Sequence, residues 1–222
     1  MGRRIADKGG SLRDDRPAGI SPRHRLLIRA CDIGFSLGGL IGFLPLLAVI
    51  GLLIKADSPG PIFFTQVRPG KDGRRFKIYK FRTMVRDAHR SPPPCRIDRL
   101  GRMEPVMKVK NDPRVTSLGR WLRKSSLDEL PQLWNVLRGE MSVVGTRPPT
   151  IEEVMAYGEA QKERLRGKPG LTGIAQIRGR TDLDFDSIVA SDVDYIRHQS
   201  LGLYFRIILR TIPVLISGKS AY

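Results

Sequence analysis

The arrangement of apolar and polar residues changes several times along the chain, and the longest apolar stretch lies near its start. Residues 33–54 read IGFSLGGLIGFLPLLAVIGLLI, 22 residues without a charged side chain. As a straight helix this stretch would be roughly 33 Å long, enough to cross the apolar core of a bilayer. The pattern therefore predicts a membrane helix, and a buried core helix is the alternative.

The residues around and within this stretch argue against a simple span. Three arginines lie just before it, between residues 23 and 29, and five Lys or Arg residues follow it up to residue 75, so the positive-inside rule places both ends in the cytoplasm. Pro45, near the middle, removes a helical hydrogen bond. We therefore expect residues 25–56 to form a re-entrant membrane helix, bent at Pro45. Three small residues recur every four positions and form either a close-packing face or one that meets lipid: Gly34, Gly38 and Gly42.

Between residues 61 and 84 the apolar residues alternate with polar ones. PIFFTQV and RFKIYKF flank the turn sequence RPGKDG, which predicts a β-hairpin. Lys80 lies on the same strand face as Phe76 and Ile78, so it is a cation beside an apolar face and within reach of a site. A solvated basic face is the alternative. Residues 91–110 contain four prolines and predict a long loop.

Helical spacing appears next in SSLDELPQLWNVLRG, which ends at the stop signal Gly139. Ser126 and Glu129 have the spacing of a capping box. Pro131 would cost a hydrogen bond in a helix that began at Ser126, whereas it would be tolerated in the first turn of a helix that began nearer Asp128.

The remaining segments are shorter. MSVVG predicts a strand, and GIAQI, after a loop rich in Gly and Pro, predicts another. The aspartates between residues 182 and 194 are expected to be solvated acids on a helix. LYFRIILRTIPVLIS is too charged to span a bilayer and predicts an interfacial helix.

These segments together predict an α+β fold. We expect a small membrane-associated domain with an N-terminal re-entrant helix, a β-hairpin or small sheet, and interfacial amphipathic helices. Residues 1–24 lack apolar periodicity and predict a disordered basic tail. We expect residues 25–56 to be the membrane helix, and residues 57–222 to be the main domain, which ends with the interfacial helix.

The amino-acid composition indicates an anionic partner. The 222 residues include 39 Lys and Arg against 22 Asp and Glu, a formal charge of +17, which suits nucleic acid, a lipid headgroup or a phosphorylated substrate. The two cysteines and three histidines are scattered and match neither a disulfide framework nor a zinc motif.

Asp128 and Glu129 are the candidate chemical groups. They are adjacent carboxylates that follow Arg120, Arg123 and Lys124. A carboxylate surrounded by cations stays ionised at neutral pH, and it can bind a divalent metal or attack phosphorus. The structural alternative is that both acids simply begin a helix, where acidic residues are common.

Several long motifs occur along the chain in an order that can be compared with known families. They are GPIFFTQVRPGKDG, FKIYKFRTM, NDPRVTSLGRWLRKSSLDELPQLWNVLRGEMSVVGTRPP and KPGLTGIAQIRGR. With them, the sequence from about residue 25 to residue 216 resembles the bacterial sugar transferase family, the small monotopic phosphoglycosyl transferases that start membrane-linked glycan assembly.

The resemblance implies transfer of a sugar-1-phosphate from a UDP-sugar to a polyprenyl phosphate, usually undecaprenyl phosphate, with release of UMP and with Mg²⁺ as cofactor. It implies that Asp128 is the nucleophile that forms a phosphosugar intermediate, and that Glu129 is its partner near the metal. Both are thereby implied as metal-binding residues.

The resemblance also implies substrate-binding residues. Arg147 and Pro148 match the family's GPRP motif, with Thr146 departing from the usual Pro, and Lys80 and Arg123 match basic positions near the active site. Tyr204 stands where many members have Asp, and no role is assigned to it.

The expected location is the cytoplasmic face of the bacterial inner membrane, with inner-membrane lipid as a partner and no nucleic acid. The alternative function is a non-catalytic membrane-anchored basic scaffold that binds anionic lipid or nucleic acid. The residues identify neither the sugar donor nor the oligomeric state.

Overall fold

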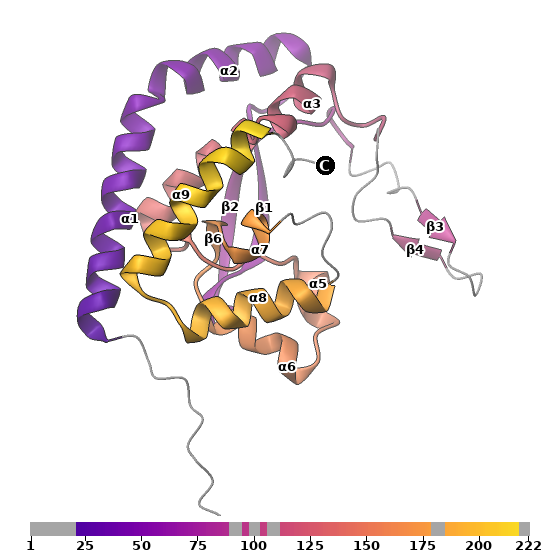
Figure 1. The fold of residues 1–222 in the computed structure, drawn as a ribbon. Helices are drawn as coiled ribbons and strands as arrows, with labels where there is room; N and C mark the ends of the chain where they lie inside the picture. Colours follow the sequence, from indigo (N-terminus) through magenta and orange to yellow (C-terminus); the bar gives the residue numbers. More distant parts are fainter. Residues whose placement is uncertain (1–20, 89–94, 98–102, 106–111, 179–184, 218–222) are drawn as a thin grey trace, which may run out of the picture.

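The structure is a computed structural model, and it describes residues 21–88, 95–97, 103–105, 112–178 and 185–217. These residues form helices and two-stranded sheets (Figure 1), which confirms the predicted α+β class. Most of the tail predicted at 1–24 lies outside the described residues, but α1 already begins at Pro22, so the last three residues of that tail are helical.

The helices of the described chain follow in order. They are α1 (Pro22–Gly42), α2 (Leu44–Asp57), α3 (Ser117–Lys124), α4 (Leu133–Arg138), α5 (Ile151–Met155), α6 (Glu159–Lys162), α7 (Ile174–Ile177), α8 (Phe185–Arg197) and α9 (Leu201–Ser217). Short 3₁₀ turns occur at η1 (Lys71–Gly73), η2 (Leu127–Gln132) and η3 (Glu163–Arg166).

The strands in the described part of the chain form three small sheets. They are β1 (Phe63–Pro69), β2 (Arg75–Phe81), β3 (Cys95–Ile97), β4 (Met103–Pro105), β5 (Ser142–Val144) and β6 (Gly170–Thr172). The antiparallel pair β1–β2 is the predicted hairpin. The parallel pair β5–β6 includes the strand predicted from MSVVG. The antiparallel pair β3–β4 lies where only a loop was expected, so that prediction was wrong for these six residues.

The N-terminal apolar stretch is bent. Helices α1 and α2 meet at 60° around Phe43, and Pro45 lies in the first turn of α2, where its missing N–H costs nothing. The bend therefore precedes the proline, because the proline ring clashes with the turn before it. No helix among the described residues is alone long and apolar enough to cross a membrane; by length and composition, only this bent pair qualifies.

Helix α1 packs through a different face from the one its glycine spacing suggested. Nothing in the described chain lies within 4 Å of a Cβ placed at Gly34, Gly38 or Gly42, whereas a Cβ at Gly39 would lie 3.0 Å from Leu133 of α4. The small face that packs on a neighbour is thus the one that contains Gly39. The three periodic glycines face away from the described chain.

A buried carboxylate joins α1 to two distant elements. Asp32 Oδ1 accepts hydrogen bonds from Ser142 Oγ and from the backbone N–H of Val143, each at 2.9 Å. It also accepts from the hydroxyl of Tyr204 on α9 at 2.9 Å. Figure 1 shows α9 beside α1, as these contacts require. Tyr204 therefore has a structural role that the sequence did not reveal.

Helix α2 is fixed to the end of the hairpin by Arg82. This side chain is 8 % exposed and donates to the carbonyls of Ile54, Ser58 and Pro59. An arginine at the C-terminal end of a helix satisfies carbonyls that have no partner within the helix. The bent helix pair and the strand that carries Lys80 are therefore joined through Arg82.

Two further sequence-based predictions were wrong. GIAQI forms the short helix α7 instead of a strand; the parallel strand ends earlier, at Thr172. Asp192 is not a solvated acid. It is 1 % exposed and accepts from Arg164 Nη2, so it belongs to a buried ion pair behind the loop that carries Arg147.

Candidate active site

The acidic pair lies on a tight turn between α3 and α4. Ser126 adopts a left-handed conformation with φ of 56°, and its side chain makes no capping hydrogen bond, so the predicted capping box is absent. The backbone N–H of Glu129 donates to the Ser126 carbonyl at 3.2 Å. Residues 127–132 then form a 3₁₀ turn, and the regular helix begins only at Leu133. Pro131 is tolerated because it precedes that helix.

Lys80 of the hairpin and Glu129 of this turn form an ion pair. Lys80 Nζ lies 2.6 Å from Glu129 Oε1, and both side chains are about one-third exposed or less. The contact follows from the packing of β2 directly against η2, so Lys80 lies beside the acidic pair.

Asp128 is the more buried member of the pair, at 9 % exposed. Burial raises its pKa to about 6, with a further contribution from Glu129, while Lys80 and Arg123 act in the opposite direction. The surrounding cations thus have the expected effect, but burial exceeds it. With a pKa about one unit below neutral pH, roughly nine-tenths of the carboxyl groups are ionised at pH 7.

Arg123 approaches the pair from α3. Its Nε donates to Thr83 Oγ1 at 2.8 Å, which holds the guanidinium beside the end of β2. The close approach of α3 depends on Gly119, because a Cβ at that position would lie 2.1 Å from the Thr83 carbonyl oxygen. The two predicted cations Lys80 and Arg123 are therefore brought to the same acidic turn.

Arg147 and Pro148 lie on the loop that follows β5, and the structure places an additional arginine there. Arg147 Nη1 pairs with Glu153 at 3.1 Å, and the Pro148 carbonyl accepts from Arg68 Nη1 at 3.3 Å. Arg68, from β1, was counted in the sequence only as a flanking charge. The QVRPG motif is the signal that could have identified it.

Arg68 links this loop electrostatically to the acidic turn. Burial lowers its pKa and the charge of Arg147 lowers it further, while Glu153, Glu152 and Glu129 act in the opposite direction. Two guanidinium groups and Glu129 therefore lie within electrostatic range of one another. Two neighbouring guanidinium groups can donate several N–H hydrogen bonds to one phosphate, so this pair is suited to binding one.

An apolar cavity of about 250 Å³ adjoins the acidic turn. Its lining residues come from the bent helix pair, the hairpin, the turn itself and α4: Leu40, Leu47, Phe63, Tyr79, Pro131 and Trp134. Pro131 belongs to the same 3₁₀ turn as Asp128, and Tyr79 precedes Lys80. An apolar ligand could therefore lie beside the carboxylates.

The donor set is compatible with magnesium. Among the described residues no group of three or more His, Cys, Asp or Glu is placed to hold a metal ion. Mg²⁺ is, however, commonly bound through one or two carboxylates together with substrate phosphates and water. Asp128 and Glu129 offer two carboxylates on one turn, so they fit this mode of binding.

Comparison with known proteins identifies the chain as one of the transferase enzymes. Residues 23–218 match the family described as bacterial sugar transferase, and the chain belongs to that family.

Individual relatives agree with this assignment. The exopolysaccharide production protein ExoY of Rhizobium meliloti is 38% identical over 211 residues, which cover 91% of each chain. The UDP-glucose:undecaprenyl-phosphate glucose-1-phosphate transferase of Caulobacter vibrioides is 40% identical over 93% of this chain and 77% of its own length. The galactosyl transferase CpsE of Streptococcus agalactiae is 45% identical over 78% of this chain, which spans only 41% of that relative.

Proposed function

We propose that the protein transfers a sugar-1-phosphate from a UDP-sugar to a polyprenyl phosphate, with Asp128 as the nucleophile. The observation that carries this proposal is the buried carboxylate of Asp128, next to Glu129, whose partner Lys80 lies 2.6 Å away. The names of relatives support the reaction class, because several act on undecaprenyl phosphate.

Two displacements at phosphorus complete the reaction. In the first, a carboxylate oxygen of Asp128 attacks the phosphorus that bears the sugar, the bond to the bridging oxygen breaks, and UMP leaves with that electron pair. In the second, a phosphate oxygen of the polyprenyl phosphate attacks the same phosphorus, and the bond to Asp128 breaks. The products are a polyprenyl diphosphate sugar and the regenerated carboxylate.

The cations allow an anionic nucleophile to approach an anionic donor. Arg68 and Arg147 bind the diphosphate, and Arg123 and Lys80 stabilise the charge that develops near Asp128. The hydrogen bond from Arg68 to the Pro148 carbonyl fixes the loop that presents Arg147. Lys80 also orients Glu129.

Asp128 and Glu129 would hold Mg²⁺, which when bound would offset the negative charge of the diphosphate.

The apolar cavity supports a prenyl acceptor. Its lining is entirely apolar or aromatic, and it adjoins the acidic turn, so the first isoprene units would lie beside the carboxylates. The phosphate of the acceptor would then reach the phosphorus bound to Asp128.

The exposed faces of α1 and α2 support insertion of the bent pair into a membrane. Helices in a soluble core bury such residues, whereas these are at least 39 % exposed: Leu26, Leu27, Ile33, Phe35, Leu37, Ile41, Phe43, Leu44, Val49, Leu52 and Leu53. We infer a re-entrant pair that enters and leaves through the cytoplasmic face of the inner membrane.

The reaction would initiate assembly of a membrane-linked glycan, such as an exopolysaccharide, capsule, O-antigen or glycoprotein. Relatives are named for galactose and for glucose, so both sugars belong among the donors to be tested.

The direct test is incubation of the purified full chain with undecaprenyl phosphate, Mg²⁺ and a panel of UDP-sugars. We expect UMP release with at least one donor. Without acceptor, a donor labelled in the sugar should label the protein. Asp128→Asn should abolish both signals, and retention of either one in this variant would assign the nucleophile elsewhere.

The same experiment separates the enzyme from the basic scaffold. A scaffold would bind anionic vesicles or DNA equally well with and without the Asp128→Asn substitution, and it would release no UMP with any donor.

A further inference from the structure

A second cleft lies at the opposite end of the hairpin from Lys80. It has a volume of about 490 Å³ and is hereafter called the turn cleft. Its lining residues come from the β1–β2 turn, the end of α4 and the loop before β6: Gly70, Lys71, Asp72, Arg74, Arg75, Phe76, Arg138, Gly139, Glu140 and Lys168. Arg75 and Lys80 are five residues apart on β2, or roughly 17 Å along an extended strand, so the turn cleft is separate from the acidic turn.

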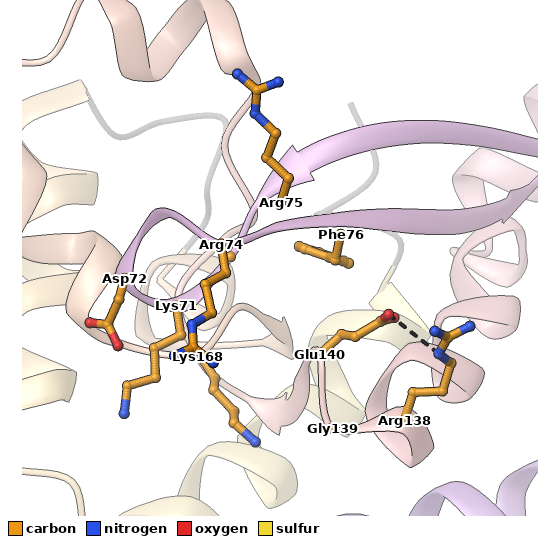
Figure 2. Close-up of a pocket in the computed structure, with 10 residues that line it drawn as sticks. Lys71, Asp72, Arg74, Arg75, Phe76, Arg138, Gly139, Glu140 and Lys168 are labelled. Carbon is orange, nitrogen blue, oxygen red and sulfur yellow. Dashed lines mark ion pairs between the residues drawn. The ribbon is translucent and has the colours of Figure 1, made fainter.

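Positive charge dominates the turn cleft. It is lined by five cationic side chains and two carboxylates, and one carboxylate, Glu140, already pairs with Arg138 at 3.3 Å. Figure 2 shows Lys71, Arg74 and Lys168 together below the turn, while Arg75 points to the other side of the strand. Within the described chain, none of these three clustered cations has an ion pair.

The backbone holds the three cations in place. The Gly70 N–H donates to the Arg74 carbonyl at 2.8 Å and closes the turn that carries Lys71 and Arg74. The Lys168 carbonyl accepts from the Thr146 N–H at 3.2 Å, which extends the parallel sheet. The cluster is therefore built into two sheets and does not depend on the chance position of a loop.

Two other cations and one carboxylate act on Lys168. Burial lowers its pKa, and the charges of Arg29 and Lys71 lower it further, with Asp32 acting in the opposite direction. Asp32 is already occupied by three hydrogen bonds. A bound anion would relieve this repulsion.

The lining also restricts the kind of anion. A nucleotide base would need an aromatic face on which to stack, but Phe76, the only aromatic residue among the described residues that line the cleft, is 8 % exposed. A compact group with several acceptor oxygens matches the N–H donors that remain. We propose that the turn cleft binds a phosphate group, as free phosphate or as the phosphodiester of an anionic phospholipid, at a second anion site distinct from the acidic turn.

The position of the turn cleft makes a lipid source chemically reasonable. Arg29 of α1 donates to the Val136 and Leu137 carbonyls and would lie 3.3 Å from a Cβ at Gly139, which lines the cleft. The uncharged run begins four residues later, at Ile33. If α1 enters the membrane as proposed, the turn cleft lies at the level of the lipid headgroups. Binding of a phospholipid therefore rests on that part of the proposed function, whereas binding of free phosphate does not.

The test compares two double variants that each remove two positive charges. Lys71→Gln with Lys168→Gln alters the turn cleft. Lys162→Gln with Arg166→Gln is the matched control. Lys162 immediately precedes η3 and Arg166 lies in it, and η3 packs near η1. Neither residue lines the cleft. All proteins are full chains in nanodiscs.

The soluble arm titrates inorganic phosphate by calorimetry into protein in phosphatidylcholine nanodiscs. The lipid arm uses nanodiscs of equal parts phosphatidylglycerol and phosphatidylcholine, and native mass spectrometry counts the phosphatidylglycerol retained on the released protein. We expect at least a tenfold weaker phosphate affinity, or loss of one retained phosphatidylglycerol, in the cleft variant and not in the matched control. The arm that responds identifies the source.

The proposal is overturned if the native chain binds neither probe, or if both double variants weaken binding equally. Should the double cleft variant fail to fold, Arg74→Gln provides the test, because this side chain is exposed and makes no hydrogen bond or ion pair with the described residues. Its expected loss of phosphate affinity is about threefold or more. Asp128→Asn should bind both probes like the native chain. If the turn cleft binds no phosphate, the result of the UMP-release experiment does not change. If no UMP is released, phosphate binding by the turn cleft can still be measured.

Discussion

Lys80 Nζ lies 2.6 Å from Glu129 Oε1, and this contact joins the open end of the hairpin to the turn that carries the acidic pair. Replacement by Met keeps the length of the side chain but removes its charge. We expect Lys80→Met to lower turnover by about 100-fold at pH 7 and to shift the acid limb of activity to higher pH, because Lys80 lowers the pKa of Asp128.

Steady-state UMP release across a pH series measures both effects. Lys77→Met, on the same strand but exposed, is the control and should behave like the native chain. An unshifted acid limb in Lys80→Met would show that this lysine acts only on binding.

The rate of protein labelling should depend on the ionisation of Asp128. Its pKa is raised to about 6, chiefly by burial, and only the carboxylate attacks phosphorus. Labelling by a sugar-labelled donor, measured in single-turnover experiments without acceptor, should be constant above pH 7 and fall about tenfold per pH unit below pH 6. A rate that stays constant down to pH 5 would exclude Asp128 as the titrating nucleophile.

Asp128→Asn should stabilise the fold at neutral pH. A carboxyl with a pKa of about 6 in the fold and 3.8 when unfolded ionises more readily in the unfolded chain, so its ionisation destabilises the fold as pH rises from about 4 to 6. The variant should gain roughly 2 to 3 kcal/mol at pH 7.5 and less than about 1 kcal/mol at pH 4. Thermal unfolding in detergent at both pH values measures the difference. Equal melting temperatures at pH 7.5 would contradict the burial argument.

Arg68→Gln should weaken donor binding. The change removes one guanidinium beside Arg147 and the hydrogen bond to the Pro148 carbonyl. We expect the KM for the UDP-sugar to rise about tenfold, with a smaller change for the polyprenyl phosphate. Arg86→Gln, an exposed arginine outside the site, is the control. Equal effects on both substrates would mean that Arg68 supports the fold without contacting the donor.

Gly119→Ala should disrupt the junction between α3 and the hairpin. The new Cβ would lie 2.1 Å from the Thr83 carbonyl oxygen, and relieving that overlap should cost about 3 kcal/mol or more. Gly38→Ala, where nothing in the described chain lies within 4 Å, should instead leave stability unchanged or raise it by up to about 1 kcal/mol. Unfolding measurements that show no difference between these variants would contradict the packing of α3.

Several elements could be predicted because a local pattern determines them. The uncharged run produces the bent pair α1–α2, and alternation on both sides of RPGKDG produces the hairpin. The sequence also drew attention to Lys80, Arg123 and the acidic pair, which the structure brings together.

Other features depend on contacts between distant residues, which no local pattern reveals. The four residues of α7 are too few to separate helix from strand by period. In the sequence, Asp192 cannot be told apart from the neighbouring aspartates. Only the structure shows that it forms a buried ion pair with Arg164. The pKa of Asp128 follows from burial, which depends on how β2 and α3 pack around the turn.

The hydrogen bond between Asp32 and Tyr204 has a consequence for the timing of biosynthesis. The two residues are 172 positions apart, so a ribosome that adds 5–20 residues per second makes Tyr204 about 10 to 30 seconds after Asp32. During that interval α1 exists without one of the three donors that hold its carboxylate, and before Ser142 is made it has none of them. Helix α1 is thus made long before it can be locked in place, and this junction can close only after Tyr204 has been synthesised.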